Sequence, residues 1–151
     1  MNDITFKVEG KVKGKGRPKF ANRGKFVKAY TPIDTVNYEQ WIRLAYQQAC
    51  SGQDTGGWEK SYNSLKMILD IHIARPKAHY NSKGEVFPRH EFKYPTTKPD
   101  IDNIIKVIAD SLNTIAYHDD SQIVVITAHK YYKEEDSVTV TLMEIEEGSW
   151  K

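Results

Sequence analysis

Five aspartates lie within the 25 residues KPDIDNIIKVIADSLNTIAYHDDSQ, and they are Asp100, Asp102, Asp110, Asp119 and Asp120. Carboxylate oxygens are the ligands that Mg²⁺ and Mn²⁺ prefer, whereas zinc favours Cys and His. Lys106 stands among these acids. A divalent cation held by carboxylates beside a lysine can activate a water and offset charge on a phosphate. The residue types therefore indicate metal-dependent hydrolysis of a phosphodiester.

A purely structural explanation of the same acids stays open at this point. Acidic residues stabilise helix N-termini through capping and the macrodipole, which would account for Asp100 and Asp102. It does not account for Asp119 and Asp120, since adjacent like charges are unfavourable unless a cation or proton neutralises them. If the strand after Asp120 lies beside the helix, both acidic pairs converge at one end of a sheet. Spacing alone does not choose between a metal site and structural acids.

The spacing predicts an amphipathic helix over 101–113. Its apolar residues fall on one stripe, formed by Ile101, Ile104, Ile105, Ile108 and Leu112. Asp102, Lys106 and Asp110 lie four residues apart on the opposite side, and Asp100 is placed to cap the first turn. We therefore expect the aliphatic residues to anchor the helix while Asp102 and Lys106 face solvent.

The remaining periodicities predict the elements that position this helix. Alternation predicts strands over 4–8, 65–73, 122–132 and 138–142, with the last two joined as a hairpin at Glu134–Asp136. A second helix is predicted from near Val36, capped by Asp34 or Thr35. Its expected core stripe is Tyr38, Trp41, Ile42, Ala45 and Ala49. These elements predict an α+β domain with a small mixed or antiparallel sheet and two main helices.

Charge is unevenly distributed although the net charge of the 151 residues is only +2. Nine basic residues and one acid lie between Lys7 and Lys28, in a glycine-rich stretch expected to form a loop or irregular hairpin. Residues 76–98 form a second basic segment with no clear period. Concentrated positive charge on a near-neutral chain favours a polyanionic partner such as nucleic acid, although a solvated lysine-rich loop would look the same.

Several classes of protein are disfavoured. The chain has neither the P-loop motif nor the G-x-G-x-x-G motif that binds the phosphates of nucleotides. It also has no EF-hand, because Ile104 and Ile105 stand where that loop needs an oxygen ligand and a glycine. The single cysteine, Cys50, fits a reducing compartment. No secretory or membrane-spanning segment is apparent, so we expect a cytoplasmic protein without membrane contacts.

The acidic stretch closely resembles the signature of the RusA-type Holliday junction resolvases. That signature is Pro-Asp-x-Asp-Asn-x-x-Lys-x-x-x-Asp followed by Asp-Asp-x-Gln. It is matched here at Pro99, Asp100, Asp102, Asn103, Lys106, Asp110, Asp119, Asp120 and Gln122. "GKGRPKF", "AYTP" and "IARPK" resemble the family more loosely. We therefore expect residues 1–151 to form a single RusA-like endonuclease domain.

The resemblance implies a homodimeric, Mg²⁺-dependent endonuclease, with Mn²⁺ as an alternative cofactor, that cuts four-way DNA junctions symmetrically in recombination or repair. Asp100, Asp102 and Asp120 would be catalytic metal ligands and Lys106 the catalytic lysine. Asn103, Asp110 and Asp119 would support them from beside the site. The proposed DNA contacts are Lys11, Lys13, Lys15, Arg17 and Lys19.

Two other functions remain as alternatives. A less selective endonuclease for flaps or forks would carry the same residues. A DNA-binding recombination accessory protein that does not cut would not need the full set of acids with Lys106.

Overall fold

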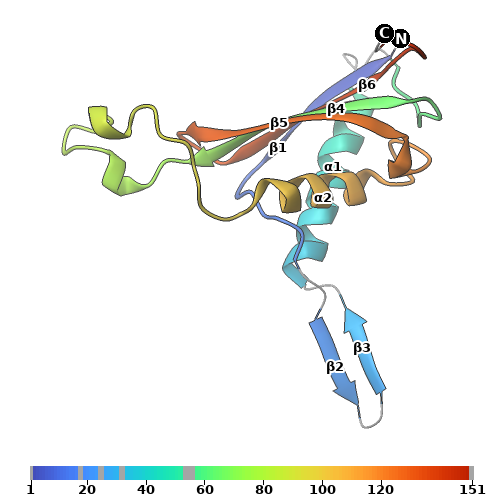
Figure 1. Ribbon diagram of the computed structural model, residues 1–151, viewed down its shortest axis with the longest axis horizontal. Helices are drawn as coiled ribbons and strands as arrows, with labels where there is room; N and C mark the ends of the chain where they lie inside the picture. The colour runs from blue at the N-terminus through green and yellow to red at the C-terminus, as the bar shows by residue number, and fades with distance from the viewer. Residues whose placement is uncertain (1, 17–18, 24–25, 31–32, 53–56, 150–151) are drawn as a thin grey trace.

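The computed structural model describes residues 2–16, 19–23, 26–30, 33–52 and 57–149. A four-stranded mixed sheet has the order β1 (Asp3–Glu9), β6 (Ser137–Glu144), β4 (Leu65–Ala74) and β5 (Ile123–Lys133). Helices α1 (Ile33–Ser51) and α2 (Ile101–Leu112) lie under one face of this sheet (Figure 1). The predicted α+β class and two main helices are confirmed.

The core lies between the helices and the sheet. Alternate residues of β4, from Leu65 to Ile71, are fully buried because successive side chains of a strand point to opposite faces. In α2 the buried stripe is Ile104, Val107, Ile108 and Leu112. The predicted stripe is therefore largely confirmed: Ile105 is partly buried against the core, but Ile101, the first residue of the helix, is 38% exposed.

The start of α1 differs from the prediction. The helix begins at Ile33, so Thr35 lies inside it. The buried Thr35 hydroxyl instead accepts a hydrogen bond from the Gly16 backbone N–H at 2.9 Å. Trp41 is not a core residue, since it is 48% exposed and its indole N–H donates to the Glu9 carbonyl at 2.6 Å. Tyr46 is buried in the core, with its ring edge-on to Phe6.

The predicted hairpin between the last two strands is wrong. Among the described strands, β5 pairs only with β4, in parallel, and β6 pairs with β4 and β1, antiparallel to both. The link between Lys133 and Ser137 therefore crosses the end of β4. The Asp136 carboxylate stabilises this crossing, because it accepts hydrogen bonds from the backbone N–H groups of Val12 at 2.9 Å and Ala74 at 2.5 Å.

Two basic segments leave the body of the molecule in different directions (Figure 1). Strands β2 (Lys19–Arg23) and β3 (Phe26–Tyr30) form the antiparallel hairpin that the glycine-rich stretch allowed. Residues 75–98 form a long loop with two short 3₁₀ turns, Lys77–His79 and Pro88–His90. No helix among the described residues has the length and apolar character needed to cross a membrane.

Candidate active site

The chain after β1 runs directly against the first turn of α2. The Lys15 backbone N–H donates to the Asn103 carbonyl at 2.9 Å. A Cβ placed on Gly14 would lie only 2.8 Å from the Cβ of Asn103. Only glycine permits this approach of the two backbones. The contact fixes the basic N-terminal segment beside the acids at the start of α2.

A cleft of about 660 Å³ opens between these two segments. Its lining residues are Lys11, Lys13, Gly14, Lys15, Lys98, Pro99, Asp100 and Asn103. Four lysines therefore surround the carboxylate of Asp100. Their positive charge would attract the phosphates of a nucleic acid toward this acidic group. Lys98 was not among the predicted DNA contacts, although its place in the basic segment 76–98 was a signal for it.

Lys15 differs from the other lysines of the cleft. Its side chain is 20% exposed, and its ammonium contacts Glu39 at 2.6 Å and Asp110 at 3.3 Å. Glu39 also pairs with Arg43 at 3.2 Å, and the Arg43 Nε–H donates to the Ser111 carbonyl at 3.0 Å. Burial alone would lower the pKa of Lys15, but the hydrogen bonds to Glu39 and Asp110 and their charges outweigh it and raise the pKa.

This network ties the N-terminal segment to both helices. Asp110 therefore has a structural partner, as its predicted supporting role allowed. Lys15 does not fit the predicted role of a phosphate contact, because a phosphate would have to replace two carboxylates. Of the other predicted contacts, Arg17 lies outside the described residues, and for Lys19 only the backbone, in β2, is described.

The acids at the start of α2 are not accounted for by capping. Asp100 occupies the cap position with extended backbone, φ −72° and ψ 145°, but its side chain makes no capping hydrogen bond. Asp102 and Lys106 are exposed, as the helical wheel predicted. The only structural effect left for Asp100 and Asp102 is therefore a favourable interaction with the helix dipole, which stabilises the helix by about 0.3–1 kcal/mol per charge.

The acids after α2 divide into two kinds. Asp119 caps the 3₁₀ turn Asp120–Gln122, where its carboxylate accepts from the Gln122 backbone and from the Ser121 hydroxyl. The Ser121 hydrogen bond is the main reason that the pKa of Asp119 is lowered. Gln122 in turn holds the carbonyls of Ser61 and Asn63 at 3.0 and 2.9 Å. Asp119 and Gln122 thus stabilise the turn that presents Asp120.

Within one chain the two acidic pairs do not converge. Asp100 and Asp102 stand at the start of α2, whereas the Asp120 backbone N–H donates to the Asn113 side chain at its end. The 12 residues of α2 separate these ends by about 18 Å at 1.5 Å per residue. Among the described residues no three His, Cys, Asp or Glu side chains lie close enough together to hold a metal ion. The expected convergence is wrong for a single chain.

Tyr117 supports this placement of Asp120. Its ring is fully buried, and its hydroxyl donates to the Ala109 carbonyl at 2.6 Å. Its pKa is raised, first by burial and then by the negative charges of Asp120, Asp110 and Asp119. The negative charges of these three acids are therefore felt at Tyr117, which follows the C-terminal end of α2.

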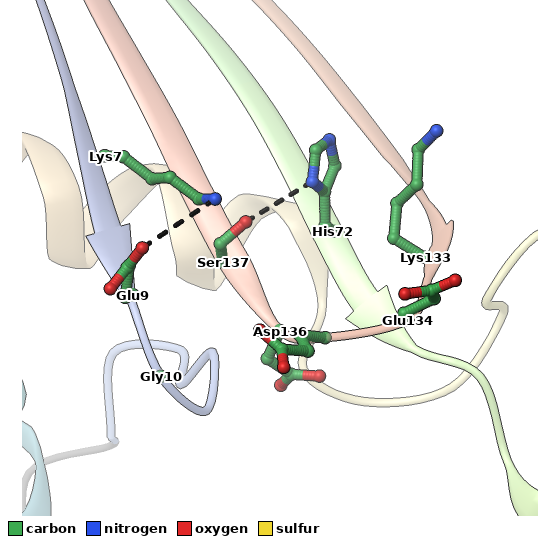
Figure 2. A pocket seen from close by; sticks show the side chains of 9 residues that line it. Lys7, Glu9, Gly10, His72, Lys133, Glu134, Asp136 and Ser137 are labelled. Atoms are coloured by element: carbon green, nitrogen blue, oxygen red, sulfur yellow. Dashed lines mark hydrogen bonds and ion pairs between the residues drawn. The ribbon is translucent and has the colours of Figure 1, made fainter.

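A second hollow, of about 560 Å³, lies where the β5–β6 link crosses β4. Figure 2 shows Lys7 facing Glu9 and the Ser137 hydroxyl facing the His72 ring. The Lys7 ammonium lies 3.9 Å from the Glu9 carboxylate, and the Ser137 hydroxyl lies 3.3 Å from Nδ1 of His72. The other ring nitrogen of His72 contacts the Tyr131 hydroxyl at 2.9 Å. None of the predicted site residues whose side chains the structure describes lines this hollow.

Comparison with known proteins places the chain in a family. The model of the endodeoxyribonuclease RusA family matches residues 9–143. The chain therefore belongs to the RusA endodeoxyribonuclease family. It is also 32% identical over 146 residues to the uncharacterized protein YqaN of Bacillus subtilis (strain 168). The alignment covers 96% of this chain and 99% of that protein.

Proposed function

We propose that this protein is a divalent-metal-dependent endonuclease that cuts four-way DNA junctions at symmetric positions. The observation that carries the proposal is the lysine-lined cleft that ends at Asp100, within a chain of the RusA endodeoxyribonuclease family. Phosphates drawn in by Lys11, Lys13 and Lys98 would lie against the start of α2, where Asp102 and Lys106 are exposed.

The donor chemistry of Asp100, Asp102 and Asp120 suits Mg²⁺ or Mn²⁺, because all three offer hard oxygen ligands. Their positions in one chain do not suit a common ion, since α2 separates Asp120 from the other two. We therefore propose the metal dependence from the chemistry of the acids. Lys106, one helical turn after Asp102, would stabilise negative charge that develops on the phosphate.

The function is tested with a synthetic four-way junction, a flap and a linear duplex, each incubated with Mg²⁺ and with EDTA. We expect Mg²⁺-dependent paired nicks in opposite strands of the junction and little cleavage of the duplex. Equal cleavage of flap and junction would favour the less selective endonuclease. Binding without cleavage in Mg²⁺ or Mn²⁺ would favour the accessory DNA-binding protein.

Asp102→Asn tests the assignment of the acids. The side chain is exposed and asparagine keeps its shape, so the loss of stability should not exceed the helix-dipole contribution of about 1 kcal/mol. Cleavage should be abolished, while junction binding in EDTA should be unchanged or tighter, since a charge that repels phosphate is gone. Cleavage at close to the parental rate would contradict the catalytic role of Asp102 and would favour the explanation that it only stabilises the helix.

A further inference from the structure

The loop between β4 and α2, residues 75–98, is a folded arm with contacts of its own. It projects beyond the ends of β4 and β5 and returns to the start of α2 (Figure 1). Inside the arm the imidazole rings of His79 and His90 stack with their centroids 4.1 Å apart. The backbone N–H of Phe87 donates to the His79 carbonyl at 2.8 Å, and the Asn81 side chain accepts two backbone hydrogen bonds in the turn that follows it. The arm therefore holds a defined shape.

The second half of the arm is attached at two places. The Arg75 guanidinium donates to the His90 carbonyl at 2.8 Å. Pro95 is buried, and the Lys130 ammonium of β5 donates to the Thr97 carbonyl at 2.8 Å. The stretch 91–94 therefore lies between two fixed points, and a partner that binds there would not have to order it first. Such preorganisation favours binding.

Two aromatic side chains on this fixed stretch are left in solvent. Phe92 is 85% exposed and Tyr94 is 71% exposed, and Phe92 is the most exposed large apolar side chain in the described part of the chain. Neither ring stacks on another ring among the described residues. Phe87 of the same arm is instead partly buried, with the Arg89 guanidinium 4.3 Å from its ring centre. Phe92 and Tyr94 therefore offer open ring faces to a partner.

The charges of the arm select a polyanion as that partner. Residues 75–98 contain six basic residues and two acids, and Lys93 stands between the two exposed rings. None of the six basic residues forms an ion pair with another described residue, so their charges are available to phosphates. Lys98 also lines the cleft that leads to Asp100. Unpaired positive charge beside open aromatic rings is the combination by which proteins hold the backbone of a nucleic acid and stack on its bases.

We propose that Phe92 and Tyr94 form a platform on which exposed bases at the branch point of a DNA junction stack. Inside a continuous duplex each base is covered on both sides by its neighbours, and parting them costs about a few kcal/mol for each step. At a branch point the stack of base pairs is interrupted, so ring faces of bases are open to an aromatic side chain. The identity of the DNA rests on the proposed function. The platform adds a contact that branched DNA can make and linear duplex cannot.

The arm places this platform close to the acids. Tyr94 precedes Asp100 by six residues, and a fully extended chain of that length spans at most about 20 Å. Successive phosphates of one DNA strand are about 3.4 Å apart along the helix axis. A base stacked on Tyr94 and a phosphate bound at Asp100 would therefore lie within roughly six nucleotides of each other. The platform would thus set the distance between the branch point and the cut.

Binding in EDTA tests the platform without any measure of cleavage. The probes are a labelled four-way junction and a linear duplex of the same total length. Phe92→Ala and Tyr94→Ala should each weaken junction binding by about 5- to 150-fold, which corresponds to about 1–3 kcal/mol for one stacked base, and should leave duplex binding unchanged. The slope of log K against log salt should not change, because no phosphate contact is lost. Phe92→Trp should keep the parental affinity, whereas Phe92→Leu should not, because leucine has no ring face.

Two control variants separate stacking from charge and from general apolar contact. Lys93→Ala should weaken binding to junction and duplex alike and should reduce the salt slope by about 0.9. Leu44→Ala removes a 42% exposed apolar side chain from α1 and should change neither. A junction with 2-aminopurine at its branch point reports stacking directly. Its fluorescence should change when the parental protein binds, and should not change when saturated with the Phe92→Ala, Tyr94→Ala double variant.

Unchanged junction affinity in the alanine variants, or equal losses on junction and duplex, would overturn the platform. So would full affinity of Phe92→Leu, since a simple apolar contact would then be sufficient. A lower mass of Phe92→Ala by light scattering would make the arm a contact between protein chains instead. A parental protein that stacks on the branch point but does not cut in Mg²⁺ would refute the proposed function alone. A protein that cuts junctions while its arm variants bind like the parent would refute the platform alone.

Discussion

Lys13 and Lys15 lie two residues apart in one basic segment, but the structure gives them different surroundings. Lys13 lines the cleft and makes no described ion pair, whereas Lys15 is held by Glu39 and Asp110. We expect Lys13 to bind phosphate together with Lys11 and Lys98. We expect Lys15 to stabilise the fold and to contribute little to the salt dependence of DNA binding.

The magnitude follows from counterion release. Each neutralised phosphate contributes about −0.9 to the slope of log K against log salt on duplex DNA. Replacing Lys11, Lys13 and Lys98 with alanine should reduce the slope by about 2.7, and the loss of affinity between about 50 and about 200 mM salt should then be about 40-fold smaller. Lys15→Ala should change the slope by less than half of one contact.

The two substitutions should affect the stability of the fold in the opposite order, with Lys15→Ala the more destabilising. Exposed ion pairs contribute up to about 1 kcal/mol, and breaking a fully buried pair costs about 3–5 kcal/mol. The Lys15 side chain is 20% exposed and Glu39 is 12% exposed, so Lys15→Ala should lower the free energy of unfolding by about 1–3 kcal/mol. Lys13→Ala should change the free energy of unfolding by less than about 0.5 kcal/mol, as is usual for a substitution on the surface.

The assay is fluorescence anisotropy with a labelled four-way junction in EDTA at several salt concentrations, paired with urea unfolding of each variant. The assignment would be refuted if Lys15→Ala flattened the salt dependence as much as Lys13→Ala. It would also be refuted if the triple variant kept the parental slope, since the cleft would then not hold the backbone of the DNA.

Three further outcomes are expected. Gly14→Ala should lower stability by about 1–3 kcal/mol and weaken junction binding, because the new methyl group would collide with Asn103; unchanged melting and binding would contradict the close approach. Burial and neighbouring cations lower the pKa values of the stacked His79 and His90, so unfolding of their loop takes up protons. Limited proteolysis of this loop should therefore increase as the pH falls below about 6.5, and no increase would refute it. Asp119 has a lowered pKa, so its stabilising effect should be present above its ordinary value of 3.8 and lost as the pH falls through the folded value; the acid unfolding of Asp119→Ala should not show that loss.

The sequence by itself determined the elements and the faces that they bury. Alternation in β1, β4 and β6 and the stripe of α2 are local patterns, and burial of one face is sufficient to specify them. The pattern of acids with Lys106 also identified the family, because those side chains are chosen for their chemistry rather than for packing.

Only the tertiary structure decided which elements are neighbours. The three residues between β5 and β6 suit a hairpin, yet β4 lies between these strands, and the non-local hydrogen bonds of Asp136 stabilise the crossing. Tertiary structure also decided the surroundings of the charged residues. Lys13 and Lys15 are equivalent in sequence, and Glu39 distinguishes them only because α1 packs beside the N-terminal segment. Asp100 and Asp120 are close in the chain, but a rigid helix holds them apart because its length is fixed by its backbone hydrogen bonds.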